Sequence, residues 1–275
     1  ESSRQSYPLN LGPVKIESRN NVPLIAAERV IYKVNGVNTS FSELMALPDS
    51  QLDTTYWLPW YNSKSLDTQL RIANVSDTEA TVHVSIGGAP VLGSPFTLTP
   101  GASIRRSFAG IDKGPVKIES NVNVIAAERV IYKLNGAGVS FSEMMALPNS
   151  QLDTTYWLPW YNSKSLDTQL RIANVTGAEA TVHVSIGGAP VTGSPFTIPA
   201  GGSKRLTFPS IDKGPVKIQS NQNIVAAERV IYKVNNVNTS FFEMMALPNS
   251  QLDVIYWMPH YNNVDFDTQL RFGVP

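Results

Sequence analysis

Apolar and polar residues alternate along several short stretches of the chain. In residues 80–88, Val82, Val84 and Ile86 occupy one phase of a period of two, and His83 and Ser85 occupy the other. Successive side chains of a β-strand point to opposite faces of a sheet, so this alternation predicts a half-buried strand. The same letters, ATVHVSIGG, return at 180–188 and predict a second such strand.

Two further kinds of strand are predicted in each third of the chain. GPVKI begins at Gly12, Gly114 and Gly214, and AAERVIYK begins at residues 26, 126 and 226. The first alternates apolar and polar residues, and the second is rich in β-branched and aromatic residues. We expect two separate strands joined by a hairpin loop, because a loop absorbs the two extra residues of the first copy at little cost.

The stretch LDTQLRIANV is also predicted to be a strand, with Leu70 and Ile72 on one face and Gln69 and Arg71 on the other. Two more short strands are expected on either side of the Pro-Gly turn at 100–101. Turn signals therefore recur about every ten residues, as in an antiparallel sandwich.

The segment SFSELMALP, residues 40–48, has a different pattern. Ser40 is followed three residues later by Glu43, which is a capping-box spacing, and Leu, Met and Ala favour helix. Pro48 would end such a helix. We predict one or two helical turns here, with a strand at a sheet edge as the competing interpretation.

The chain is a tandem repeat. WLPWYNSKSLDTQLRIANV occupies residues 57–75 and returns unchanged at 157–175, and a degraded copy, WMPHYNNVDFDTQLRFGVP, occupies 257–275. Each period of about 100 residues contains about seven predicted strands. The predicted fold class is all-β, with tandem immunoglobulin-like antiparallel β-sandwiches.

The run LRIANVSDTEATVHVSIGG…TLTPGASIRRSF…GPVKIES resembles tandem immunoglobulin-like modules of large prokaryotic extracellular and surface proteins. In those modules an Asn-x-Ser/Asp turn, a T-V-x-V strand and a Pro-Gly-x-Ser turn follow one another in this order. The resemblance extends over nearly the whole chain. It implies the sandwich fold and a location outside the cell or on its surface, and it implies no activity.

Composition narrows the expected partners. The 275 residues have a net charge of zero, and 16% of them are charged. This balance argues against nucleic acid or an anionic membrane as the main partner, since both favour clustered Lys and Arg. No apolar stretch approaches the roughly 18 residues of a membrane span. Cysteine is absent, and many Asn, Ser, Thr and Gly residues fit an extracellular surface.

The aromatic cluster Trp57, Trp60 and Tyr61 allows two interpretations. It could be a platform on which sugars stack, or it could pack between sheets or between successive modules. In a strand Trp57 and Trp60 cannot both face one side, so packing is favoured. His260 stands where the last copy would have the third such Trp, which suggests a role at the junction between modules.

No residues form a recognisable catalytic, metal or cofactor site. His83 and His183 are predicted to be exposed, with no second ligand at metal-binding spacing. The turns at Asp112 and Asp212 each supply a single acid, too few for calcium. No nucleophile–base–acid set or phosphate loop is found, so we do not expect an enzyme.

Charged residues recur at matching positions in every copy, namely Glu28, Arg29, Asp67 and Arg71 and their counterparts. An active site has no need to appear three times. Their repetition predicts structural ion pairs or hydrogen bonds.

The copies are unequal in number. The stretch from GPVK to LDTQLR occurs three times, and the stretch from ANV to IDK occurs twice. The predicted division is an N-terminal partial module (1–56), two complete modules (57–156 and 157–256) and the C-terminal strands of another partial module (257–275). Both partial modules would expose apolar strands, which proteins usually avoid.

A head-to-tail arrangement removes this exposure. The C-terminal strands of one subunit would complete the N-terminal half-module of the next, giving an extracellular filament of identical subunits. The expected interface residues are Val14, Ile16, Val30, Ile31, Trp257, Tyr261, Leu270 and Phe272. The alternative is a stalk or adhesin segment that binds glycans or a cell surface through Trp57, Trp60 and Tyr61.

Overall fold

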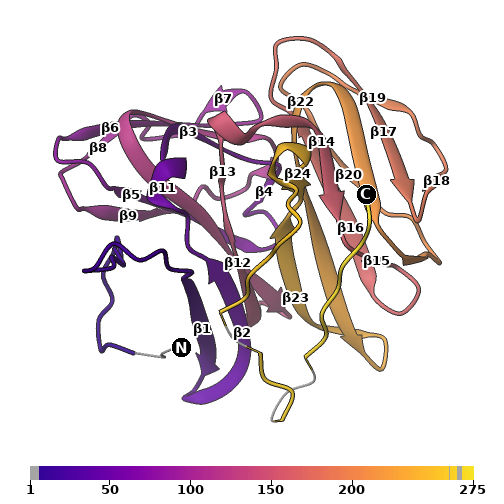
Figure 1. Ribbon diagram of the computed structural model, residues 1–275, viewed down its shortest axis with the longest axis horizontal. Helices are drawn as coiled ribbons and strands as arrows, with labels where there is room; N and C mark the ends of the chain where they lie inside the picture. Colours follow the sequence, from indigo (N-terminus) through magenta and orange to yellow (C-terminus); the bar gives the residue numbers. More distant parts are fainter. Residues whose placement is uncertain (1–5, 260, 265–267) are drawn as a thin grey trace.

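The computed structural model describes residues 6–259, 261–264 and 268–275. This part of the chain is all-β with antiparallel pairing, and its helical segments are three single 3-10 turns. Two modules of the same design lie next to each other, and an N-terminal hairpin packs beneath the first (Figure 1). The predicted all-β tandem architecture with a repeat of about 100 residues is confirmed.

The N-terminal hairpin consists of β1 (Ala27–Val34) and β2 (Val37–Met45) and is followed by the turn η1 (Asp49–Gln51). The first module comprises β3 (Asp53–Leu58), β4 (Tyr61–Asn62), β5 (Asp67–Asn74), β6 (Ala80–Ile86), β7 (Ala89–Pro90), β8 (Phe96–Leu98), β9 (Ser103–Arg106), β10 (Asp112–Lys113), β11 (Val116–Leu134), β12 (Ala137–Met145) and β13 (Leu147–Pro148).

After the turn η2 (Asn149–Gln151), the second module repeats this order. It comprises β14 (Asp153–Leu158), β15 (Tyr161–Asn162), β16 (Asp167–Asn174), β17 (Ala180–Ile186), β18 (Ala189–Pro190), β19 (Phe196–Ile198), β20 (Ser203–Leu206), β21 (Asp212–Lys213), β22 (Val216–Val234), β23 (Val237–Met245) and β24 (Leu247–Pro248), followed by η3 (Asn249–Gln251).

The long strand β11 organises the first module. Its first part, residues 116–120, pairs with β3 on one side and β6 on the other. Its second part, residues 124–134, pairs with β5 and β12. Side chains from both parts and from β3, β5 and β6 meet in one core. In the second module β22 has the same role.

These pairings join consecutive copies of the repeat. β5 belongs to the first copy of LDTQLR, and it pairs with β11, which belongs to the second copy of GPVKI…AAERVIYK. β16 of the second copy pairs in the same way with β22 of the third. A complete module therefore needs strands from two successive copies.

The prediction for GPVKI and AAERVIYK is wrong, since residues 12–16 of the first copy form no strand and only AAERVIYK does, as β1. GPVKI and AAERVIYK do not form two strands joined by a hairpin loop in the second and third copies, because β11 and β22 each continue unbroken for 19 residues. The extra length is accommodated by an irregularity in the pairing with β3, between Glu119 and Val124. The strand can continue because its two parts have different partner strands.

The predicted helix at 40–48 is also wrong. Residues 37–45 form β2, and the equivalent residues form β12 and β23. A helix of one or two turns is marginal in isolation, whereas this segment pairs along its whole length with the preceding strand. The competing interpretation, a strand at a sheet edge, is the one the structure adopts.

Three equivalent hairpins, β1–β2, β11–β12 and β22–β23, pack in succession (Figure 1). Ser140 Oγ lies 3.1 Å from Ser40 Oγ and 3.0 Å from Ser240 Oγ, so one hydroxyl row runs through all three. The backbone N–H of Glu143 donates to Ser42 Oγ, and that of Glu243 donates to Ser142 Oγ. Side-chain hydroxyls thus satisfy backbone donors of the next hairpin.

Candidate interaction site

The apolar residues of the first GPVKI…AAERVIYK copy lie at the surface, and of this copy only AERVIYKV, β1, forms a strand. Val14 and Ile16 are 72% and 60% exposed, whereas their counterparts Val116 and Ile118 are fully buried. Ile31 is also exposed and Val30 is half-buried. The difference arises because the counterparts are covered by strands of the preceding copy, β3, β5 and β6.

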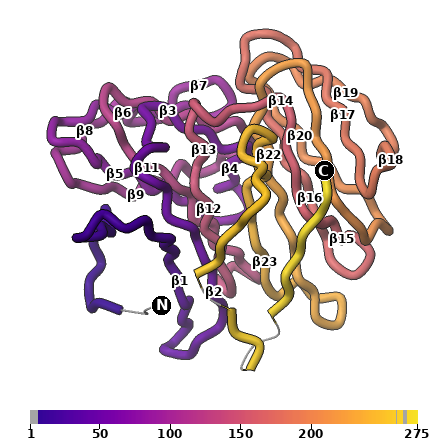
Figure 2. Tube along the Cα trace, viewed as in Figure 1, coloured from indigo at the N-terminus to yellow at the C-terminus, as the bar shows by residue number. Residues whose placement is uncertain are grey.

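The third copy of the WLPWYN…LDTQLR stretch shows the complementary exposure. Residues 252–259, 261–264 and 268–275 contain no strand, and residues 268–275 run beside the second module (Figure 2). Trp257 and Phe272 are 73% and 88% exposed, and Tyr261 and Leu270 are exposed as well. All eight residues of the predicted interface therefore lie in surface segments, and seven of them are themselves exposed.

The third copy nevertheless keeps the local hydrogen bonds of the other two. The Asp253 backbone N–H donates to Tyr256 Oη at 2.9 Å, and Tyr261 Oη donates to the Thr268 carbonyl at 3.1 Å. The Thr268 hydroxyl donates to the Asn262 carbonyl. The same bonds are made by Asp153, Tyr161 and Thr168 in the second copy. The segment is therefore already shaped like its paired counterparts.

The long-range bonds of this stretch are made to the following copy. Tyr56 Oη donates to the Val124 carbonyl at 2.8 Å, and Tyr156 Oη donates to the Ile224 carbonyl at 2.7 Å. Asp53 Oδ2 accepts from the Ser150 backbone N–H at 2.8 Å. In the third copy, Asp253 Oδ1 accepts from the Val254 backbone N–H and Tyr256 Oη accepts from that of Asp253, and both bonds are local.

Charged side chains of consecutive copies gather between the stacked hairpins. Glu128, Arg171, Arg229 and Glu243 form one cluster, and Glu28, Arg71, Arg129 and Glu143 form the equivalent one. Within them Arg229 pairs with Glu243, Arg129 Nη2 lies 2.6 Å from Glu143 Oε1, and Arg71 Nε lies 4.0 Å from the same oxygen. The predicted structural ion pairs are confirmed for the recurring arginines at 129 and 229.

These clusters explain why both faces of β16 are covered. Leu170 and Ile172 point into the core as predicted, and Arg171 on the opposite face is only 2% exposed because the third hairpin covers it. Burial lowers the pKa of Arg171 to about 9, and the neighbouring Arg229 adds to this effect. Burial and Glu243 raise the pKa of Glu128, while Arg229 and Arg171 oppose the rise.

Glu228 is the counterpart of Glu28 and Glu128 in the third copy. It is buried, and burial raises its pKa to about 8, with Arg271 acting in the opposite direction. A carboxyl whose pKa is raised in the folded chain contributes full stability below its unfolded pKa of 4.5, and this contribution is lost as pH rises through about 8.

We expect Glu228→Gln to flatten this part of the pH dependence. The wild-type chain should lose on the order of a few kcal/mol between pH ~5 and pH ~9 through this group alone, because about 1.4 kcal/mol corresponds to each pKa unit. The measurement is urea unfolding of both chains at the two pH values, with Glu17→Gln as the control on an exposed carboxyl. An equal loss in wild type and Glu228→Gln would contradict the assignment.

The aromatic patch proposed for glycans is largely covered. Trp57 is 7% exposed and contributes to the core cluster of the second module, and Tyr61 is buried. The indole N–H of Trp57 donates to Asn149 Oδ1 at 3.0 Å, and that of Trp60 donates to Asp112 Oδ1 at 2.7 Å. These contacts favour packing over glycan binding: Tyr61 lies in the core of the first module, and Trp57 and Trp60 contact the second. His260 lies outside the described residues.

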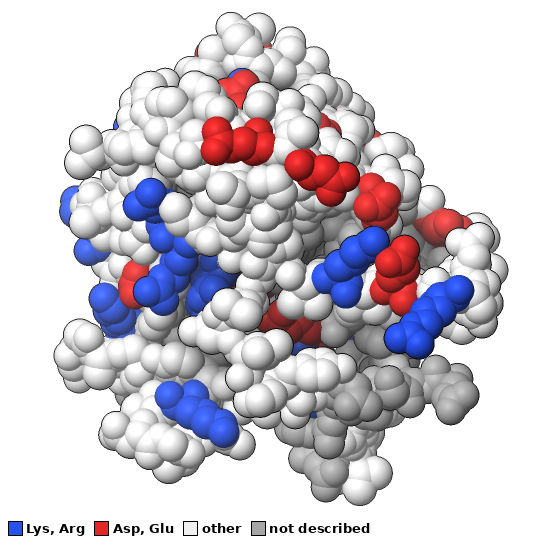
Figure 3. Space-filling model, turned by 90° about the vertical axis from the view of Figure 1, so that its left-hand side faces the viewer, with Lys and Arg blue, Asp and Glu red and all other residues white. Residues whose placement is uncertain are grey.

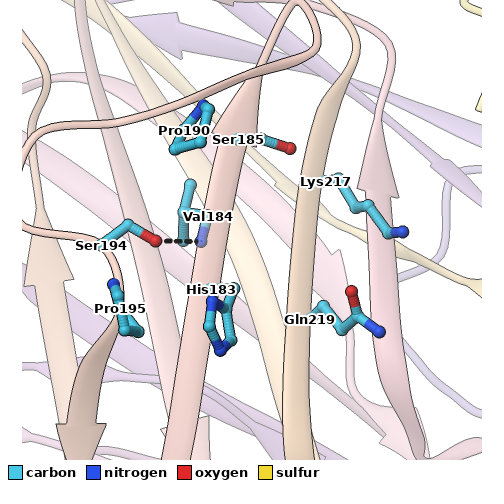
Figure 4. A pocket seen from close by; sticks show the side chains of 8 residues that line it. All are labelled: His183, Val184, Ser185, Pro190, Ser194, Pro195, Lys217 and Gln219. Atoms are coloured by element: carbon cyan, nitrogen blue, oxygen red, sulfur yellow. Dashed lines mark hydrogen bonds between the residues drawn. The ribbon is translucent and has the colours of Figure 1, made fainter.

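The histidines of the β6 and β17 strands are exposed, as predicted. His183 lines a shallow depression on the outer face of β17 together with Lys217 and Gln219 of β22 (Figure 4). The Ser194 hydroxyl in the same depression accepts the Val184 backbone N–H at 2.9 Å and is used structurally. Among the described residues, no group of three or more His, Asp or Glu side chains could hold a metal ion.

The face shown in Figure 3 presents both signs of charge, and neither covers it. The helical segments in the described ranges are single turns, and none has the length and hydropathy that a membrane-crossing helix requires. The exposed apolar residues of the N-terminal and C-terminal segments therefore remain the candidate interaction site.

Comparison with known proteins adds little to this assignment. No protein-family model matches the chain, and no curated protein matches it either. A solved structure, the crystal structure of Thermotoga maritima 1070, is similar over 35% of this chain and 95% of its own, with 16% sequence identity and a TM-score of 0.31. A likeness this distant supports no argument about function.

Proposed function

We propose that the chain is the structural subunit of an extracellular filament or surface fibre, and that it polymerises head-to-tail by β-strand complementation. One observation supports this most strongly. Both internal pairings, β5 with β11 and β16 with β22, join one copy of the repeat to the next. The first AAERVIYK copy and the last LDTQLR copy are the two halves of a third such pairing.

Self-association by this route answers a physical problem. A strand edge with exposed apolar side chains is a template for pairing with another strand. The C-terminal segment of one chain has the sequence and the local hydrogen bonds of the strands that pair with the equivalents of the N-terminal edge, so it can pair with that edge of another chain. Because the segment and the edge lie on different parts of the chain, the contact is heterologous, and each added chain leaves a free edge or segment for the next chain.

The extracellular location in this proposal rests on the resemblance to immunoglobulin-like modules of prokaryotic surface proteins and on the low charge with many Asn, Ser, Thr and Gly residues. The joint between two copies would contain no counterpart of β6 to β10, since those strands come from the stretch present twice. It would bury less apolar surface than an internal module, so we expect association to be reversible and to depend on concentration.

The test is the mass of the purified full chain by light scattering over a wide concentration range, followed by electron microscopy of concentrated material. We expect the mass to rise with concentration, and fibres with an axial repeat of two to three modules. The double variant Leu270→Asp/Phe272→Asp should remain monomeric, because charges cannot enter the apolar joint. Leu92→Asp, at a loop position that is 96% exposed, is the matched control and should assemble as wild type does. A wild-type chain that stays monomeric and fully folded at high concentration would overturn the proposal.

A further inference from the structure

Within one chain the structure contains two complete examples of the contact that would join two chains, and the two examples agree in detail. Thr68 pairs with Val130, and Thr168 pairs with Val230. Leu70 is opposite Glu128, and Leu170 is opposite Glu228. The register is therefore the same at both places, residue for residue.

From these examples we infer that the joint between two chains has one defined register, in which residues 268–273 of one chain pair antiparallel with residues 25–30 of the next chain. In this register the Arg29–Glu43 pair of the next chain completes a charged cluster with Glu228 and Arg271 of the first. This inference rests on the proposed function and specifies its partner as a second copy of this chain. Thr268 is placed opposite Val30, and Leu270 opposite Glu28.

The charged cluster is the first observation that selects this register. In each example within the chain, the earlier repeat supplies one Glu and one Arg, and the following repeat supplies an Arg–Glu ion pair. In the second example these are Glu128 and Arg171, followed by Arg229 and Glu243. Glu228 and Arg271 are the earlier half of a third cluster. The later half is Arg29 with Glu43, whose Nε and Oε1 lie 2.6 Å apart on the N-terminal hairpin.

A charge cluster of this kind contributes specificity more than affinity. Burying an ion pair costs about as much desolvation as its attraction returns. A shift of the strand by one residue, however, would move Leu270 and Phe272 to the charged face and Arg271 to the apolar one. Misaligned partners would also bring like charges together, and such repulsion discriminates against wrong pairings.

A glycine at the start of the GPVK strand is the second, independent observation. A Cβ on Gly114 would lie 2.2 Å from the Pro59 carbonyl oxygen, and one on Gly214 would lie 2.2 Å from that of Pro159. Both contacts are to the backbone of the preceding copy. Gly12 is the equivalent residue of the first copy, and a Cβ there would meet nothing closer than Ser103 Oγ at 3.5 Å. The inferred register places the Pro259 backbone of another chain against Gly12.

The first experiment uses Gly12→Ala. Because the free chain has room for the methyl group, unfolding should be unchanged, whereas the added Cβ should weaken association by about tenfold or more, equivalent to about 1.4 kcal/mol. The control is Gly177→Ala, since nothing lies within 4 Å of a Cβ there. Association equal to that of wild type would overturn the placement of Gly12.

The second experiment reverses the Arg29–Glu43 pair. Arg29→Glu/Glu43→Arg keeps an ion pair within the hairpin, but it places a carboxylate at position 29, facing Glu228 of the other copy, and a guanidinium at position 43, facing Arg271. We expect association to fall by about tenfold or more. Adding Arg271→Glu should recover part of the loss, because Arg71 and Glu143 are neighbours in the internal cluster. No loss in the double variant, or no recovery in the triple variant, would overturn the assignment of the cluster.

A mixing experiment tests the direction of the contact. Leu270→Asp/Phe272→Asp removes the donated segment, and Gly12→Ala impairs the accepting edge. At a concentration where wild type associates and Gly12→Ala does not, each variant should be mainly monomeric alone, and an equal mixture should stop at a one-to-one pair. A mixture that stays monomeric would contradict the joint. If wild type never associates, or if Leu270→Asp/Phe272→Asp associates as wild type does, the proposed function itself fails. If only Gly12→Ala and the Arg29–Glu43 variants behave like wild type, the register alone fails.

Discussion

Leu170→Ala is expected to lower the free energy of unfolding by about 2–5 kcal/mol, whereas Leu270→Ala should leave it unchanged in the monomer. Both residues occupy the same place in the repeat. Leu170 is fully buried in the core of the second module, and Leu270 is 56% exposed. Removing the buried side chain loses its transfer free energy and leaves a cavity, while removing the exposed one does neither.

The measurement is urea unfolding, monitored by tryptophan fluorescence, at a concentration low enough to keep the chain monomeric. The two substitutions are chemically identical, so a difference between their effects reports the surroundings of the two leucines. Comparable destabilisation by both would mean that the Leu270 side chain is buried within the chain in solution. At high concentration Leu270→Ala should instead weaken association, which separates its role from that of Leu170.

The sequence predicted the buried residues correctly in strands that face the core on one side and solvent on the other. In β6 and β17 the alternation of Val82, Val84 and Ile86 with His83 predicts burial correctly, because each strand buries one face and exposes the other. The pattern of β16 was harder to interpret. Arg171 alternates with Leu170 as a solvent-facing residue would, yet it is buried because another copy of the hairpin covers it.

The missed features have a common physical origin. The helix prediction at 40–48 relied on the local Ser-x-x-Glu spacing, but Glu43 and its counterparts pair with arginines across the hairpin, as Arg129 does with Glu143. The recurrence of Glu and Arg in every copy did indicate ion pairs. It could not identify which copies contribute them, since near-identical copies leave the pairing between them undetermined by sequence alone.

The unbroken course of β11 was also beyond local pattern. Between GPVKI and AAERV the sequence contains Asn and Ser residues that are typical of a turn. The strand continues because β3 and β6 end as partners where β5 and β12 begin. Such a change of partners depends on long-range contacts, which outweigh local preference.

Gly114→Ala should destabilise the chain by about 3 kcal/mol, the upper end of the usual range for overpacking, and Gly12→Ala should not destabilise it. The Cβ on residue 114 would lie 2.2 Å from the Pro59 carbonyl oxygen and 2.9 Å from Trp60 Cα. Both are backbone atoms, so no side-chain rotation relieves the overlap. The strand that contains Val116 and Ile118 would have to move away from β3.

Gly214→Ala provides an internal repetition of the same change, since its Cβ would meet the Pro159 carbonyl oxygen at the same distance of 2.2 Å. Urea unfolding of the three alanine variants at low concentration is the measurement. Equal stability for Gly114→Ala and wild type would show that the first module tolerates a wider separation of these strands. The contrast among the three glycines follows from the repeat itself: the same residue is under steric constraint wherever a preceding copy packs against it, and free of that constraint in the first copy.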